Sequence, residues 1–364
     1  FREAGYRTGY VGKWHLDGKP KPGFTPPGPR RQGFEFWEAF NRGHSHLDGQ
    51  PRFTDDGELY WEEGYQPELQ TDLAIDFVTE HAGAEPFFCY LSWGPPHGPF
   101  EAPEEYSAMY DPDDLDLRPN VPEVEDHADL RYDLAEYYGL VTSLDDQLQR
   151  LLDTLDEQGV ADDTLVVFTS DHGEMMGSLG HYRKGYPFEE SIHVPQVWRY
   201  PEGLPAGEEC SAFVNLVDLL PTLLPWAGAE VPASARGDDI RPVLRGETEG
   251  RDAAYVEGEL PFHDEWRAVR TEEYMLAVDD QLRVRHLYDM ERDPYQMENL
   301  AGDPEYEETA ADLLDRMVGA AEEFRDTEVW ARWFKRDVIG APLDEASDVF
   351  DGYDDVVEGP SRYE

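Results

Sequence analysis

An apolar strand runs directly into a polar turn in Leu165-Val166-Val167-Phe168-Thr169-Ser170-Asp171-His172-Gly173-Glu174. An unbroken run of apolar and β-branched residues is typical of a strand that is buried on both faces. A long helical pattern precedes this strand and ends at Gly159. A helix followed by a buried strand indicates an α/β fold, in which helices cover a central, mostly parallel sheet.

The helical pattern before that strand covers about residues 129–158. Its apolar residues recur at steps of three and four, as they do on the core-facing side of an amphipathic helix: Leu134, Tyr137, Val141, Leu144, Leu148, Leu151 and Leu155. A second helix is predicted over 67–83, and a second buried strand, 87–92, follows it. Cys89 lies inside that strand, where we interpret it as an inert core thiol. The repeated order predicts a sheet that helices cover on both faces.

Beyond about residue 250 the pattern changes to shorter strands, which we predict over 253–257, 266–270, 274–278 and 282–287. A last helix is predicted over 305–324. These elements indicate a small subdomain with an antiparallel sheet. We therefore divide the chain into a catalytic α/β domain (1–250), a C-terminal subdomain (251–334) and an acidic, irregular tail (335–364).

The charge of the chain is strongly negative. Its 364 residues contain 80 Asp and Glu against 30 Lys and Arg, which gives a net charge of −50. The carboxylates are spread among apolar and aromatic runs, so they indicate a folded domain with an acidic coat, as in proteins of salt-loving organisms. Such a surface excludes nucleic acid as a partner, because binding phosphates requires basic patches.

No apolar run is long enough to span a membrane, since Asp218 and two prolines interrupt the best candidate, 213–229. We expect no membrane partner. A cytoplasmic location is favoured, and secretion stays open. The two cysteines, Cys89 and Cys210, do not form a disulfide framework.

Polar side chains follow both predicted buried strands. Ligands of open α/β sheets bind beyond the carboxyl ends of the strands. The strand that ends at Thr169 is followed by Asp171 and His172, and the strand that ends near Ser92 is followed by His97. Asp171 and His172 could cap a helix, and His97 could be a turn residue. The alternative is that they meet in one site, where they would bind a cation or an anionic substrate.

Lysine is rare in this chain, which has five, and two of them lie in suggestive places. Lys13 stands two residues before His15 in what reads as a short strand, so both side chains would face one pocket. Lys184 follows Asp171 downstream. A cationic pocket in an anionic protein suits a small dianionic group, whose oxygens Lys, His and a metal stabilise. His44 to His46 lie in a Gly-flanked loop, where solvated histidines are favoured over a role in lining the pocket.

Taken in order, these segments resemble the sulfatase family of the alkaline-phosphatase superfamily. The resemblance rests on AGYRTGYVGKWHL (4–16), LSWGPPHGPF (91–100), FTSDHGE (168–174) with Lys184 and 189–191, and the run 287–300. It extends from Phe1 to about Phe324. It implies an alkaline-phosphatase-like fold and the hydrolysis of sulfate esters of small molecules or saccharides.

The resemblance also implies roles for individual residues. Lys13 and Lys184 would hold the sulfate oxygens. His15 would contact the nucleophile and assist its regeneration, and His97 would protonate the leaving alcohol or phenol. Asp171 would bind a divalent cation, usually calcium. His172 would fill the neighbouring ligand position, where many relatives have Asn.

The nucleophile of the family is a formylglycine, made from Cys or Ser in a Cys/Ser-x-Pro/Ala-x-Arg segment. Neither Cys89 nor Cys210 stands in such a segment. We therefore expect the nucleophile, and the paired acidic ligands of the family's first strand, to lie upstream of Phe1, and the chain alone to be inactive. Two alternatives remain at this point: a phosphodiesterase or phosphonate hydrolase of the same superfamily, and a catalytically silent, sulfatase-like binding protein.

Overall fold

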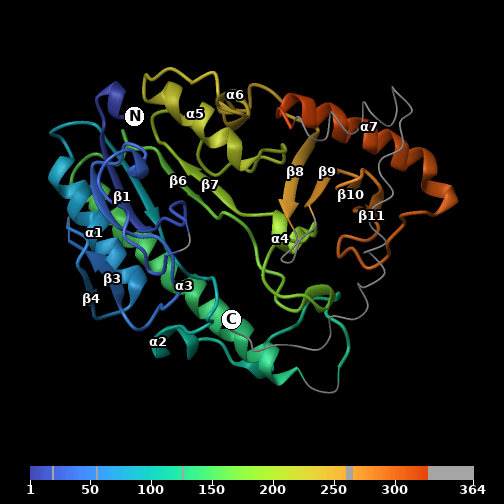
Figure 1. Cartoon of the computed structure of the whole chain (residues 1–364), viewed down its shortest axis with the longest axis horizontal. Helices are drawn as coiled ribbons and strands as arrows, with labels where there is room; N and C mark the ends of the chain where they lie inside the picture. The colour runs from blue at the N-terminus through green and yellow to red at the C-terminus, as the bar shows by residue number, and fades with distance from the viewer. Residues whose placement is uncertain (19, 55, 125–126, 260–264, 327–364) are drawn as a thin grey trace.

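The structure is a computed structural model that describes residues 1–18, 20–54, 56–124, 127–259 and 265–326. Figure 1 shows an N-terminal α/β part on one side and a C-terminal sheet on the other. The first sheet has the order β2-β1-β5, in which β1 (Arg7–Lys13) pairs in parallel with β2 (Phe36–Phe40) and β5 (Phe87–Ser92). Gly12 has a φ of 102°, and a Cβ there would collide with the carbonyl oxygen of Ser92. Glycine thus lets the end of β1 approach β5 closely.

Two long helices cover one side of this sheet. The helix α1 (Gln66–His81) packs against β1, β5 and α3 (Ala128–Glu157), and the short α2 (Glu104–Ser107) also packs on α3. The helices predicted over 67–83 and 129–158 are thereby confirmed. Among the described residues, no helix is long and apolar enough to cross a membrane.

Two pairs of antiparallel strands in the described part of the chain have no ladder with the first sheet. The strand β6 (Val166–Thr169) pairs with β7 (Gln196–Arg199) and forms the second piece of the α/β sheet, and β3 (Gln50–Phe53) pairs with β4 (Leu59–Glu62) in a separate hairpin. Within the described ranges, β6 has no ladder with β5. The mixed sheet with flanking helices that the sequence predicts is therefore present, but in two pieces. Three short helices follow β6 along the chain: α4 (Glu189–Ile192), α5 (Leu219–Trp226) and α6 (Arg241–Leu244).

The C-terminal elements form the predicted antiparallel sheet. Its order is β11-β10-β9-β8, from β8 (Ala253–Glu259), β9 (Glu265–Thr271), β10 (Tyr274–Asp279) and β11 (Val284–Asp289), and α7 (Glu307–Glu323) follows. Figure 1 places α7 beside this sheet. The prediction of a C-terminal antiparallel sheet with a terminal helix is confirmed, whereas the predicted tail, 335–364, lies outside the described residues.

Both faces of the C-terminal sheet are covered, as the nearly continuous burial of β10 indicates. Leu276 of β10 packs with Met317 of α7 in one core cluster. Met275, its neighbour on the opposite face, packs with Met175 and Phe188 in another. The segment from 175 to 188 contains Lys184, so the C-terminal sheet supports one wall of the candidate site.

Candidate active site

Lys13 is the last residue of β1 and is partly buried. The chain then leaves the strand, because His15 has a φ of 55° and is exposed, although its backbone N still donates to the carbonyl of Asn41 at 2.7 Å. The prediction that Lys13 and His15 share one face of a strand is therefore wrong. The left-handed backbone of His15 ends the alternation of side chains that the prediction assumed.

His97 lies in the segment after β5 and is held on several sides. Its Nδ1 is 2.7 Å from the carbonyl oxygen of Gly98, so Nδ1 carries the proton and Nε2 keeps a lone pair. Nε2 lies 3.1 Å from Nζ of Lys184, which donates to it. The Nε2 of His46 donates to the backbone oxygen of His97 at 2.6 Å. This imidazole therefore has a fixed tautomer and a fixed direction.

Lys184 lies in a tight turn that the C-terminal sheet holds in place. Its neighbours Arg183 and Gly185 both have positive φ, at 70° and 101°. The carbonyl of Gly185 accepts a hydrogen bond from Nε1 of Trp266 in β9 at 2.8 Å, and the backbone N of Gly185 donates to Oγ of Ser191 at 3.1 Å. Trp266 itself is buried. The backbone beside the lysine is thus held by one contact from the distant strand β9 and one from nearby Ser191.

Asp171 and His172 follow β6 and offer two metal-binding atoms. The Asp171 side chain is 86 % exposed. The Nδ1 of His172 donates to the carbonyl of Gly173 at 2.8 Å, and its Nε2 lies 3.5 Å from Oδ2 of Asp171. A carboxylate oxygen and an imidazole nitrogen side by side fit part of a divalent-cation site. In the part of the chain that the structure describes, no group of three or more His, Cys, Asp or Glu could hold an ion.

Each of the six predicted residues interacts electrostatically with at least one of the others. Burial lowers the pKa of Lys13 to about 8, and Lys184 lowers it too, whereas Asp171 opposes the change. The pKa of His15 is lowered by partial desolvation of its exposed ring and then by Lys13 and other cations. Burial lowers the pKa of His97 to about 4, with Lys184, Lys13 and His172 acting in the same direction. Positive charge is thus crowded here, as in a site for an anion.

Two further histidines belong to this site, contrary to the prediction of solvated loop side chains. His44 stacks on His97 with ring centroids 3.8 Å apart and planes 5° apart, and its Nε2 is 3.2 Å from Nζ of Lys13. His46 is 1 % exposed. Burial, then His97 and Lys13, lowers the pKa of His44 to about 2, so its ring is neutral. Glycine beside the histidines suggested a loop in solvent, and no local pattern shows that this loop folds back onto β5.

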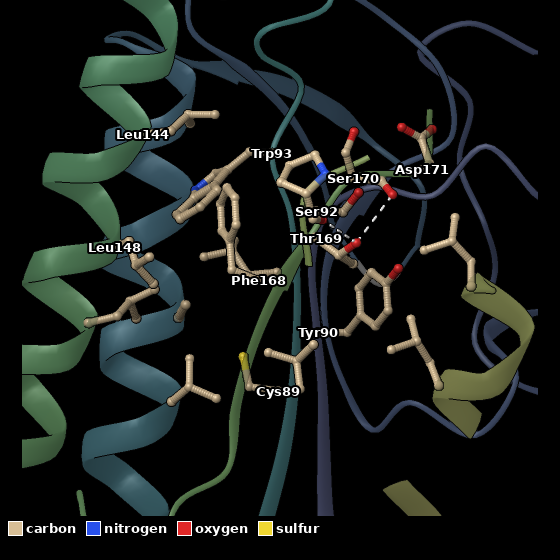
Figure 2. Close-up of a pocket in the computed structure, with 18 of the residues that line it drawn as sticks. Cys89, Tyr90, Ser92, Trp93, Leu144, Leu148, Phe168, Thr169, Ser170 and Asp171 are labelled. Atoms are coloured by element: carbon tan, nitrogen blue, oxygen red, sulfur yellow. Dashed lines mark hydrogen bonds between the residues drawn. The ribbon is translucent and has the colours of Figure 1, made fainter. Parts of the chain in front are cut away.

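Beneath the site lies a cavity of about 1900 Å³ between β5 and β6. Figure 2 shows Ser92 and Asp171 at one end of it, Cys89 at the other, and Leu144 and Leu148 of α3 along one side. Its walls also include apolar residues of α5 and more of α3: Leu219, Leu220, Leu223, Leu151 and Leu155. Burial raises the pKa of the Cys89 thiol to about 12, which agrees with an inert cysteine.

Comparison with known proteins identifies the family. The family model described as Sulfatase matches residues 1–229, and the one described as N-sulphoglucosamine sulphohydrolase, C-terminal, matches 177–323. The chain belongs to the sulfatase family. The predicted family is confirmed, and with it the chemistry: this sulfatase is a hydrolase of sulfate esters.

Two relatives of this sulfatase have names that specify a substrate. It is 34 % identical over 351 residues to the ulvan-active sulfatase of Formosa agariphila, covering 91 % of this chain and 67 % of that protein. It is 26 % identical over 413 residues to an N-acetylglucosamine-6-O-sulfatase of Bacteroides thetaiotaomicron, covering 90 % and 72 %.

Solved structures confirm the alkaline-phosphatase-like fold. A sulfatase-family protein of Bacteroides fragilis matches with a TM-score of 0.81 at 26 % identity, over 90 % of this chain and 77 % of that one. The phosphonate monoester hydrolase of Agrobacterium radiobacter matches with a TM-score of 0.72 at 24 % identity, over 90 % and 79 %, and this likeness concerns the fold alone.

Proposed function

We propose that this sulfatase removes sulfate from a saccharide sulfate ester, at the site formed by Lys13, His15, His97 and Lys184. One observation carries the proposal. The two ammonium groups of Lys13 and Lys184 stand at the two ends of a pair of stacked, neutral imidazoles. Ammonium groups that are turned inward in a chain of net charge −50 have a physical reason only if they meet an anion.

The electrostatics favour a bound dianion. Burial lowers the pKa of both lysines, so their surroundings disfavour the charged form of each. A sulfate group between them would restore the charged forms, because an opposite charge nearby raises the pKa of an ammonium. Sulfate oxygens would then accept hydrogen bonds from both.

The pair of His97 and Lys184 is suited to deliver a proton to the leaving oxygen. With a pKa near 4, His97 is neutral at pH 7, and the proton between the two groups resides on Lys184. Negative charge on a bound sulfate ester favours protonation of the pair as a whole. Either nitrogen could then donate as the bond between sulfur and the leaving oxygen breaks.

We also propose one divalent cation, calcium, with Asp171 and His172 among its ligands. When bound, the cation would supply positive charge to the sulfate oxygens. Asp171 offers an oxygen of the kind that calcium prefers, and calcium takes about six to eight such ligands, so further donors are needed. Equilibrium metal analysis tests the assignment: Asp171→Asn should lower calcium affinity at least tenfold.

The nucleophile is proposed to be a formylglycine on a segment that is not among these 364 residues. The cavity between β5 and β6 supports this placement. In the described residues β5 pairs only with β1, and β6 only with β7, so each strand turns an unpaired edge toward the cavity. A strand placed between them would be covered by apolar side chains of α3 and α5 on its two faces. Its end would lie near Asp171.

The proposed substrate class follows the relatives, whose names specify ulvan and N-acetylglucosamine-6-O-sulfate chemistry. A panel of sulfated monosaccharides and oligosaccharides, with an aryl sulfate and an aryl phosphonate alongside, tests it. We expect sulfate release from at least one saccharide to exceed turnover of the phosphonate by about 10²-fold or more in kcat/KM. Preference for the phosphonate would overturn the proposal and favour the phosphonate hydrolase alternative.

A further inference from the structure

His44 lies between Lys13 and His97 in the proposed sulfate site, and the proposed reaction assigns it no role. It lies on the loop between β2 and β3 and contacts two side chains, one at the end of β1 and one in the segment after β5. Its ring lies flat against the ring of His97, and its Nε2 is 3.2 Å from Nζ of Lys13. The same loop is anchored through His46, which donates to the backbone oxygen of His97 and whose own carbonyl accepts from the backbone N of Gln66.

The partner of each ammonium group in this site is an imidazole. Lys13 donates to His44, and Lys184 donates to His97. A carboxylate in either place would also orient the ammonium, but it would cancel the charge that a sulfate group needs. A neutral imidazole accepts the hydrogen bond and leaves that charge in place. Because the two rings stack, contacts run without a break from Lys13 through His44 and His97 to Lys184.

We propose that His44 is a positioning residue of the sulfate site: its Nε2 directs the ammonium of Lys13, and its ring face fixes the plane of His97. The inference rests on the proposed function of the site and deepens it. The acceptor atom Nε2 orients Lys13 and the ring face orients His97, and substitutions can remove these two contacts one at a time.

Three substitutions separate these contributions. His44→Phe keeps a flat ring against His97 and removes the acceptor. His44→Gln keeps a side-chain acceptor and removes the ring. His44→Ala removes both. His127→Ala is the matched control, because His127 precedes α3 and makes no side-chain capping contact. Thermal melts identify any variant that fails to fold.

The measurement is the binding of inorganic sulfate by titration calorimetry at constant ionic strength. We expect His44→Ala to weaken sulfate binding about tenfold, and His44→Phe to weaken it severalfold, since hydrogen bonds that involve a charged group contribute more than stacking contacts. Nitrogen-15 NMR of the histidines provides a second readout. The signal of the His97 Nδ1 proton, held by Gly98, should persist in His44→Phe and weaken in His44→Ala.

Three outcomes would count against different parts of the account. If His44→Phe binds sulfate as the wild type does, His44 only packs against His97 and the inference is wrong. If Lys184→Ala also binds sulfate unchanged, the site itself is misplaced and the proposed function fails. Loss of binding in Lys184→Ala together with unchanged binding in all three His44 variants would reject the inference alone.

Discussion

Nζ of Lys184 lies 3.1 Å from Nε2 of His97, and the two residues come from segments 87 positions apart in the chain. The lysine is carried by a turn that the C-terminal sheet supports through Trp266, and the histidine by the segment that follows β5. One proton lies between two nitrogens whose pKa values are both lowered by burial. Such a pair acts as a unit in catalysis.

The first prediction concerns this unit. In a catalytically competent form of the enzyme, His97→Ala and Lys184→Ala should each lower kcat by about 10²-fold, the usual contribution of a general acid. The double variant should lose little more than either single one, because both changes remove the same proton donor. Steady-state kinetics of the four proteins give the test. Multiplicative losses would show that the two groups act independently.

The pKa of Lys13 predicts an alkaline limit. Lys13 is charged below its pKa of about 8 and loses its proton as the pH rises through that value. Attraction for the sulfate group is therefore present at neutral pH and is lost above about pH 8. We expect kcat/KM, which reports the free enzyme, to fall in that range. Lys13→Arg should remove this fall, since guanidinium keeps its charge. An unchanged profile in the variant would assign the limit to another group.

Trp266 should support activity from a distance. Trp266→Phe removes the hydrogen bond to Gly185 and part of a buried ring, which should cost roughly 1–3 kcal/mol of stability. Because Gly185 adjoins Lys184, we expect sulfate affinity to fall severalfold as well. Trp61→Phe is the control, since Trp61 is 51 % exposed. Equal sulfate affinity in Trp266→Phe and the wild type would mean that the turn around Lys184 does not depend on the hydrogen bond from Trp266.

The net charge of −50 predicts a response to salt. Self-repulsion of the surface should weaken as salt rises to molar concentrations, where the Debye length is about 3 Å. The Tm should therefore increase from low to molar sodium chloride. Melting curves over that range give the test, and a constant Tm would reject the interpretation of the acidic coat as an adaptation to salt.

Much of the fold could be predicted because helix and strand periods are local properties of the sequence. The helix α3 shows both the success and its limit. Its apolar stripe was predicted to face a core, and Leu144 and Leu155 are indeed buried. Val141 on the same stripe is 44 % exposed, although it lines the same cavity between β5 and β6 as the two buried leucines.

The candidate site was predictable only in part, for a related reason. Asp171 and His97 follow strands that the sequence pattern identifies, so the rule for α/β sheets locates them. His44 has no such signal, since its role depends on a loop that folds back onto the segment after β5. The direction of His15 does not follow from the pattern, because β1 ends at Lys13, two residues earlier, and the backbone of His15 is left-handed. These features depend on tertiary contacts, which periodicity does not encode.

The most direct test of the account is the release of inorganic sulfate from a sulfated saccharide, in molar salt with calcium. It compares the protein extended upstream of Phe1, the same protein with Lys13→Ala and Lys184→Ala, and residues 1–364 alone. We predict turnover by the extended protein, a loss of at least about 10²-fold in the double variant, and no turnover by residues 1–364, because we propose that the nucleophile lies upstream of Phe1. Robust, metal-dependent turnover by residues 1–364, or undiminished turnover by the double variant, would contradict the account.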